Sequence, residues 1–247
     1  VNSINWARVL AQVVYYFTSA VALGAPHRKV SFTVPTGNFG DVFAGYIAKR
    51  MGLPIERLVI ATNTNDILHR CMQSADYIKQ GVVPTMSPSM DIEVSSNFER
   101  ALYFAHDQDG AAVAGLMEEL GENGGFHISE NAMSALLTHY DSGMADEQTT
   151  TATIRTTRSE TSELLCPHSA VAVHVATQHL MENPAVPMIT LATAHPAKFP
   201  DAVEAATGLR PPLPDRMASI MTADERVTQV PNELAPLQTL VRKARRT

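Results

Sequence analysis

The sequence predicts an α/β domain whose sheet is mainly parallel and flanked by helices. Two observations carry this prediction: β-rich runs at residues 30–34 and 58–62, and an amphipathic helical pattern after each of them. Alternation of strand and helix is typical of βαβ units, in which helices connect parallel strands. The chain has 247 residues, of which 45% are hydrophobic and 18% charged, so we expect a sizeable core.

The first predicted helix begins after the expected cap Ser3 and ends before Gly24 and Pro26. Its apolar residues recur every three or four positions and are Trp6, Val9, Leu10, Val13, Val14, Phe17 and Val21. Residues 9–26 carry no formal charge, but polar interruptions and the helical stripe argue against a membrane span. We therefore interpret this segment as an amphipathic helix that packs on the sheet.

A polar stripe lies on the opposite side of the same helix. Asn5, Arg8 and Gln12 are three and four positions apart, so they project from one face. They lie near the helix start, where free backbone donors and the helix dipole favour an anion. A solvated polar face has the same pattern, and both interpretations stay open.

A loop with two glycines follows the first strand. Residues 35–41 read Pro-Thr-Gly-Asn-Phe-Gly-Asp and lead into a helix that ends near Met51. Glycines allow backbone amides to converge on a phosphate, and the following helix contributes its positive end. The run is not a P-loop, because no Gly-Lys-Ser/Thr follows, and it lacks the third glycine of a dinucleotide fingerprint. Asp41 would slightly oppose an anion. Phosphate binding and a structural turn are the alternatives.

The remaining elements continue the alternation of helix and strand. In order, we expect a helix from Asp66, an irregular connection at 81–96, helices at 97–105 and 111–120, a strand at 126–128, helices from Ser129 to near Tyr140 and at about 168–181, and a strand at 186–192. We divide the chain into an α/β body, residues 1–208, and a C-terminal helical extension, residues 209–247.

Composition excludes several classes of function. The net charge of −6 argues against nucleic acid as a partner, because neutralising phosphates needs clustered Lys and Arg. Two cysteines are too few for a disulfide framework, and we see no signal peptide, so cytoplasm is the expected location. We expect no metal, because the nine histidines form no His-Glu-x-x-His motif and His168, His174 and His179 do not share a helix face.

Ordered motifs along the whole chain resemble those of threonine synthases. They read VNSINWAR at 1–8, PTGNFGD at 35–41, ATNTND at 61–66, SPSMDI at 87–92 with SSNFER at 95–100, and ATAHPAKF at 192–199. The resemblance places this chain as the C-terminal half of the family's polypeptide. It implies the larger-domain portion of a fold-type-II enzyme that uses pyridoxal 5′-phosphate, incomplete at its N-terminal side.

The resemblance also implies an activity and a set of site residues. The family converts O-phospho-L-homoserine and water into L-threonine and phosphate. By the family pattern, the cofactor phosphate is held by backbone amides of the loop residues Gly37, Asn38, Phe39 and Gly40. Thr193 would hydrogen-bond the pyridine nitrogen. Asn5 and Arg8 are candidates for the substrate phosphate, Arg8 because its planar fork matches phosphate oxygens.

The chain departs from the family in one important respect. The family's Schiff-base lysine lies upstream, and none of the lysines here has its motif context; they are Lys29, Lys49, Lys79, Lys198 and Lys243. Lys198 lies in a matching motif, but its position is not that of the Schiff-base lysine. We therefore assign no catalytic residue to this chain, and we expect it to need the upstream half of the same enzyme as a partner.

Other functions stay open at this point. A related phospholyase would release phosphate and let the product collapse to a keto acid. A non-catalytic domain that binds a phosphorylated ligand would keep the loop and need no lysine. A lysine in the family's Phe-Lys-Asp context upstream would favour the enzymes over the binding domain.

Overall fold

The computed structural model of the protein describes residues 4–245. The chain forms two compact units, Val1–Pro211 and Pro212–Thr247. Every strand found among the described residues lies in the first unit, and the second contains a 3-10 helix, η3 (Asp215–Met221), and the helix α10 (Leu234–Ala244). The assignment of residues 1–208 to a cofactor-binding body stays a prediction.

A parallel sheet forms the centre of the first unit. Its strands lie in the order β5-β2-β1-β6 and are β1 (Val30–Pro35), β2 (Ile55–Thr62), β5 (Tyr140–Met144) and β6 (Met188–Thr190). Each neighbouring pair is parallel. A separate antiparallel pair joins β3 (Asp76–Ile78) to β4 (Gly125–His127). The predicted α/β class with a mainly parallel sheet is confirmed.

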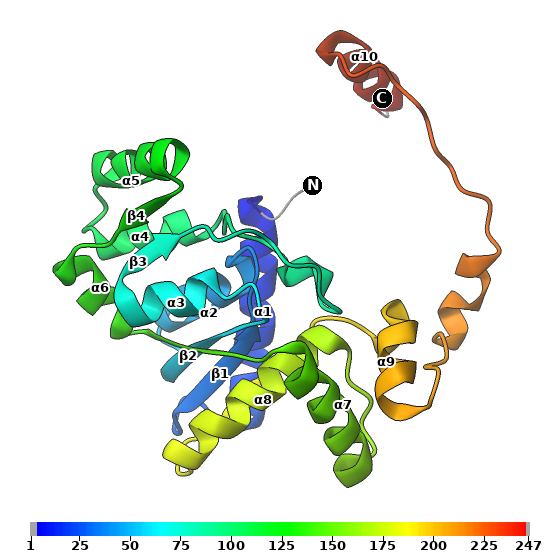
Figure 1. Cartoon of the computed structure of the whole chain (residues 1–247), viewed down its shortest axis with the longest axis horizontal. Helices are drawn as coiled ribbons and strands as arrows, with labels where there is room; N and C mark the ends of the chain where they lie inside the picture. Colours follow the sequence, from blue (N-terminus) through cyan, green and yellow to red (C-terminus); the bar gives the residue numbers. More distant parts are fainter. Residues whose placement is uncertain (1–3, 246–247) are drawn as a thin grey trace. The chain divides into compact units, whose positions relative to one another are not determined.

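Helices cover both faces of the parallel sheet. Along β2, Leu58 and Ile60 pack in the main core with residues of α1 (Trp6–Ala22) and α2 (Gly40–Arg50). The intervening residues Val59 and Ala61 pack against α8 (Pro167–Glu182). This alternation follows the two-residue period of a strand that is buried on both faces. In Figure 1, α8 crosses in front of the strands and α1 lies behind them.

The other elements of the first unit surround this arrangement. They are α3 (Ile67–Ser74), η1 (Pro88–Met90), α4 (Phe98–Ala105), α5 (Gly110–Asn123), α6 (Glu130–Leu137), α7 (Glu147–Thr161), η2 (Pro196–Lys198) and α9 (Pro200–Thr207). Within residues 4–245, no helix combines the length and apolar character that crossing a membrane requires.

Two sequence-based expectations about elements are wrong. The helix expected to run to near Tyr140 ends at Leu137, and Tyr140 begins β5. The polar and small residues of β5 hide it from a search for apolar alternation, yet it pairs with β2 and closes one edge of the sheet. The expected cap Ser3 lies outside the described residues. Instead, Asn5 is the N-cap of α1, because its Oδ1 accepts the amide hydrogen of Ala7 at 2.9 Å.

Candidate functional site

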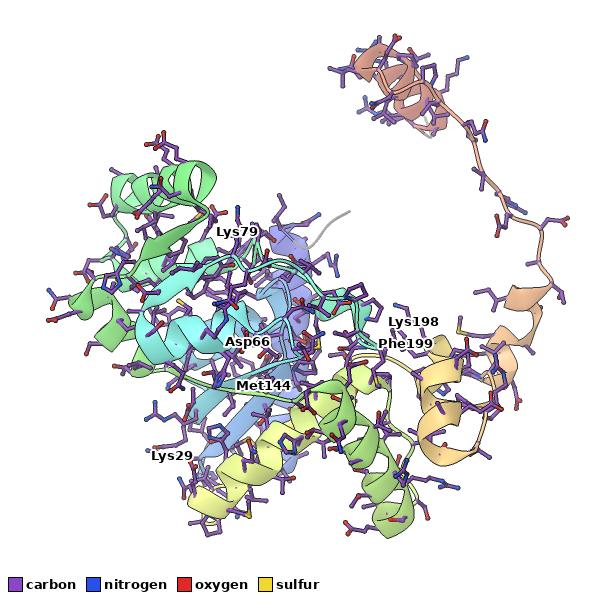
Figure 2. All side chains as sticks on the ribbon, viewed as in Figure 1. Lys29, Asp66, Lys79, Met144, Lys198 and Phe199 are labelled. Atoms are coloured by element: carbon purple, nitrogen blue, oxygen red, sulfur yellow. The ribbon has the colours of Figure 1, made fainter. Side chains whose placement is uncertain are left out.

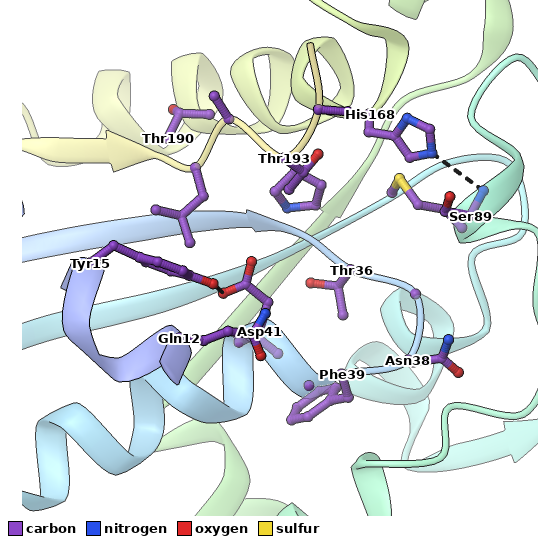
Figure 3. Close-up of a pocket in the computed structure, with 18 of the residues that line it drawn as sticks. Gln12, Tyr15, Thr36, Asn38, Phe39, Asp41, Ser89, His168, Thr190 and Thr193 are labelled. Atoms are coloured by element: carbon purple, nitrogen blue, oxygen red, sulfur yellow. Dashed lines mark hydrogen bonds between the residues drawn. The ribbon is translucent and has the colours of Figure 1, made fainter. Parts of the chain in front are cut away.

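A cavity of about 870 Å³ lies at the carboxyl ends of β1 and β6. Its walls come from one side of α1, residues 35–42 at the end of β1 and the start of α2, residues 89–90, and residues 189–194 at the end of β6 and just beyond it, with His168, Lys198 and Phe199 completing it. Figure 3 shows these walls facing one another. Open α/β sheets bind ligands at the carboxyl ends of their strands, and the volume is in the range of small-molecule sites.

Residues 37–40, which we call the glycine loop, join β1 to α2. Phe39 has a φ of +62°, in the left-handed region that non-glycine residues rarely adopt. Its ring is buried and packs against Phe98 and Tyr140, with centroid distances of 5.1 and 5.4 Å. This burial compensates for the backbone strain and fixes the shape of the loop.

Hydrogen bonds hold the carbonyl groups of the glycine loop and leave its amides open. Ser95 Oγ donates to the carbonyl oxygen of Gly37 at 2.7 Å, and Asn97 Nδ2 donates to that of Asn38 at 2.9 Å. No acceptor among the described residues bonds to an amide of the glycine loop. Free amides at the start of a helix form an anion site, and they fit the cavity lining in which these residues lie.

Gly37 allows a second segment to approach the loop. A Cβ atom at Gly37 would lie 2.6 Å from the carbonyl oxygen of Ser89 and 3.3 Å from the Cα of Met90. Residues 87–90, which we call the serine segment, therefore pack directly on the backbone of the loop. Any larger residue at position 37 would push the two apart.

Buried polar side chains hold the serine segment. Asn63 Nδ2 donates to Ser87 Oγ at 2.9 Å and to Asp91 Oδ1 at 2.8 Å, and Asn65 Nδ2 donates to the same oxygen of Asp91 at 2.9 Å. Asn63 is 1% exposed. These two asparagines precede α3 (Ile67–Ser74), whose N-cap is Asp66, so their side chains are free to serve this network.

His168 supports the serine segment from the other side. Its Nε2 accepts the amide hydrogen of Ser89 at 3.3 Å, which assigns the ring proton to Nδ1 (Figure 3). The pKa of His168 is lowered to about 4, mainly by burial and also by the positive charge of Lys198, while Asp91 opposes this shift. His168 is therefore neutral at pH 7. The sequence does not reveal this support, since the pattern of histidines bears only on metal binding. Pro167, in the first turn of α8, was the signal for a helix start at this site.

The first turn of α8 bonds both to the serine segment and to the segment that contains Thr193. Next to His168, Ser169 Oγ accepts the amide hydrogen of Thr193 at 3.3 Å. Thr193 follows the last residue of β6 by three positions, and its side chain is exposed in the same cavity as the glycine loop. The structure therefore brings together the residues predicted to bind a phosphate and a ring nitrogen.

The polar stripe of α1 lies only partly in the cavity. Arg8 and Gln12 line it, whereas Asn5 does not and instead caps α1. Tyr15, further along the same face, donates to Asp41 Oδ1 at 2.5 Å. Burial raises the pKa of Asp41, and the hydrogen bonds from Tyr15 and Tyr16 oppose that shift. In the part of the chain described here, no cluster of three or more His, Cys, Asp or Glu side chains could hold a metal ion.

Comparisons with known proteins identify the relatives of this chain. A family model described as "Threonine synthase, C-terminal" matches residues 169–241. A threonine synthase from Pseudomonas aeruginosa is 49% identical over 242 residues, which make up 98% of this chain and 51% of that protein. Over nearly its whole length, the chain is similar to threonine synthases. It spans about half the length of the curated threonine synthases it matches.

Solved threonine synthases share the fold. A structure described as PLP-bound threonine synthase from Brucella melitensis matches 100% of this chain and 53% of its own, with a TM-score of 0.90 and 55% identity. Yeast threonine synthase matches 98% of this chain and 52% of its own, with a TM-score of 0.84 and 39% identity. The structural neighbours are therefore fold-type-II threonine synthases, as the motifs predicted.

The lysines of this chain are scattered. Lys29, Lys79 and Lys198 lie at separate places on the molecule (Figure 2). Among the described residues that line the cavity, Lys198 is the one lysine. It lies at the end of η2, and its Nζ is 5.7 Å from the centroid of the Phe199 ring.

Proposed function

We propose that this chain is the part of a threonine synthase that holds the phosphate and the ring of its cofactor. The whole protein would convert O-phospho-L-homoserine and water into L-threonine and phosphate. The single observation that carries the proposal is that the glycine loop, whose amides have no acceptor among the described residues, lines the same cavity as Thr193. The names of the relatives support the reaction.

The cofactor that fits this arrangement is pyridoxal 5′-phosphate. The amides of Gly37, Asn38, Phe39 and Gly40 would hold its phosphate, because they lack acceptors among the described residues and lie at the positive end of α2. The Thr193 hydroxyl would hydrogen-bond the ring nitrogen. When bound, this cofactor supplies an electron sink for the carbon atoms of the substrate.

A threonine beside the ring nitrogen has a chemical consequence. Its hydroxyl is neutral and can donate a hydrogen bond, so the nitrogen stays largely unprotonated, whereas a carboxylate partner would favour its protonation. The amide of Thr193 is held by Ser169, which limits where the hydroxyl can lie. Thr193 would therefore both orient the ring and moderate its strength as an electron sink.

For the substrate phosphate we propose Arg8, with Asn5 as a second ligand. Arg8 lines the cavity from α1, and a guanidinium can donate two parallel hydrogen bonds to a phosphate. The Oδ1 atom of Asn5 is used by the cap of α1, which leaves its Nδ2 as a donor. The upstream half of the enzyme would supply the lysine that moves protons, and we propose the cytoplasm as the location.

Turnover measurements test this proposal. The 247-residue chain alone should release no phosphate from O-phospho-L-homoserine, and mixing it with a separately produced upstream half of the Pseudomonas aeruginosa relative should give both phosphate and L-threonine. A keto acid in place of L-threonine would favour the phospholyase. Sustained threonine formation by this chain alone would overturn the assignment and give a catalytic role to one of its own lysines, with Lys198→Gln as the first variant to measure.

A further inference from the structure

Asp41 places an acidic side chain next to the proposed phosphate site. It is the second residue of α2 and follows the glycine loop directly. Free amides in the first turn of a helix attract carboxylates as well as phosphates, and acidic side chains at this position bind there readily. Without restraint, the Asp41 carboxylate would therefore compete with a phosphate for the amides of the loop.

In the structure the carboxylate is directed elsewhere. Asp41 Oδ1 accepts hydrogen bonds from the hydroxyls of Tyr15 at 2.5 Å and Tyr16 at 3.2 Å, and Tyr16 also donates to the main-chain oxygen of Asp41 at 2.8 Å. Figure 3 shows the Tyr15 hydroxyl meeting the Asp41 carboxylate. No amide among the described residues of the glycine loop donates to Asp41.

The two tyrosines differ in what fixes them. Tyr16 is 0% exposed and packs on Phe32 at a centroid distance of 4.7 Å, so its ring is part of the core. Tyr15 lines the cavity on the same face of α1 as Gln12 and Ser19, and its hydroxyl makes the shorter bond to the carboxylate. Hydrogen bonds to a charged acceptor are the stronger ones, so Tyr15 is the main restraint on Asp41 that can be removed without opening the core.

We propose that Tyr15 is a positioning residue that holds the Asp41 carboxylate against α1, so that the amides of the glycine loop stay open to an external phosphate group. This inference rests on the proposed function to the extent that the loop binds phosphate. It adds that the site contains a built-in competitor and a hydroxyl that keeps it away.

The proposal predicts that one substitution weakens phosphate binding and that a second substitution restores it. In Tyr15→Phe the carboxylate loses its shorter hydrogen bond and turns toward the loop amides, so affinity for phosphate falls by about tenfold, the equivalent of one hydrogen bond to a charged group. Asp41→Asn removes the competing charge. The double variant Tyr15→Phe/Asp41→Asn should therefore bind phosphate at least as tightly as the unaltered chain.

The experiment titrates the unaltered chain, Tyr15→Phe, Asp41→Asn and the double variant with pyridoxal 5′-phosphate and, separately, with inorganic phosphate. Tyr103→Phe in α4 is the matched control, because no described residue hydrogen-bonds the Tyr103 hydroxyl, and it should bind as the unaltered chain does. Circular dichroism confirms that each variant is folded. Amide hydrogen exchange gives a second readout without ligand: exchange at residues 40–42 should slow in Tyr15→Phe and recover in the double variant.

The outcomes separate this inference from the proposed function. If Tyr15→Phe binds phosphate as the unaltered chain does, or if the double variant is as weak as Tyr15→Phe, Tyr15 has only a structural role and the inference is overturned. If Asp41→Asn does not fold, unchanged exchange at residues 40–42 in Tyr15→Phe overturns it equally. If the unaltered chain binds neither ligand, the proposed function fails, and this role of Tyr15 fails with it.

Discussion

The glycine loop and the serine segment touch through Gly37 and Ser89: a Cβ atom at position 37 would lie 2.6 Å from the Ser89 carbonyl oxygen. The same Ser89 donates its amide hydrogen to His168 in the first turn of α8. Three parts of the chain that are distant in sequence therefore fix the backbone that would hold a phosphate. Substitutions of Gly37 and of His168 should therefore both alter the conformation of the glycine loop.

Gly37→Ala should weaken the binding of pyridoxal 5′-phosphate and destabilise the fold by about 1–3 kcal/mol, because the added methyl group overpacks the loop against backbone atoms of the serine segment. Urea unfolding and ligand titration measure the two effects. The matched control is Gly115→Ala in α5, where no atom lies within 4 Å of the new Cβ. It should leave binding unchanged and stabilise the helix by up to about 1 kcal/mol. Equal binding by both variants would contradict the packing argument.

His168 should make stability depend on pH in the acid range. Its pKa is lowered from 6.5 to about 4 by burial, so the unfolded chain binds more protons than the folded one between these values. The free energy of unfolding should therefore fall as the pH drops from about 6.5 toward about 4, and this group contributes at most about 1.4 kcal/mol per pH unit.

His168→Gln tests that contribution, because the Gln side-chain oxygen can still accept from Ser89. Burial also lowers the pKa values of His69 and His139, so the variant should reduce the pH dependence and not remove it. Urea unfolding at pH 7.5 and pH 5 measures the difference. If the free energy of unfolding falls by the same amount between pH 7.5 and pH 5 in the variant and in the unaltered chain, His168 does not contribute to the pH dependence.

Much of this site could be predicted from local sequence. The β-rich run, the glycines and the amphipathic run after them gave β1, the glycine loop and α2, because strand period, glycine and helix period are all local signals. The pairing of Tyr15 with Asp41 could not be predicted in this way, since it joins residues 26 positions apart through the packing of α1 on α2. The role of His168 depends on a contact across 79 positions for the same reason.

A substitution of Asn5 can separate its role as the N-cap of α1 from its proposed role as a ligand of the substrate phosphate. Asn5→Asp keeps the oxygen that accepts from Ala7, so α1 should stay intact, but it removes the Nδ2 donor and adds a negative charge. If Asn5 binds the substrate phosphate, Asn5→Asp should raise the dissociation constant for O-phospho-L-homoserine by about tenfold or more in the reassembled enzyme.

Asn5→Ala is the control for that measurement. It removes the cap and should cost about 1 kcal/mol of stability. Should Asn5→Asp bind the substrate as the unaltered enzyme does, Asn5 is a cap alone and Arg8 is left as the candidate ligand.

Thr193→Val should weaken the binding of pyridoxal 5′-phosphate by about threefold to tenfold, because the hydroxyl that would meet the ring nitrogen is lost while the shape is kept. The amide of Thr193 still donates to Ser169, so the wall of the cavity should not move. Thr193→Ser keeps a hydroxyl and should bind nearly as the unaltered chain does. The ultraviolet absorption of the bound cofactor measures both affinities. If Thr193→Val binds as the unaltered chain does and Thr193→Ser binds more weakly, the methyl group matters and the hydroxyl does not.

β5 could not be predicted from the sequence. Its residues Tyr140-Asp141-Ser142-Gly143-Met144 have no apolar alternation, and the strand is specified by its pairing with β2 and by the close approach of Gly143 to Val175 of α8. A Cβ atom at Gly143 would lie 2.7 Å from a Val175 methyl carbon. Such tertiary requirements leave no periodic signal in a single sequence.

We propose that the glycine loop of this chain binds the phosphate group of pyridoxal 5′-phosphate. The most direct measurement compares the affinities of the purified chain for pyridoxal 5′-phosphate and for pyridoxal, which lacks the phosphate. We predict that the phosphorylated form binds at least about tenfold more tightly, the equivalent of one or more charge-assisted hydrogen bonds, and that inorganic phosphate displaces it. Equal affinities for the two compounds, with no competition from phosphate, would contradict the claim.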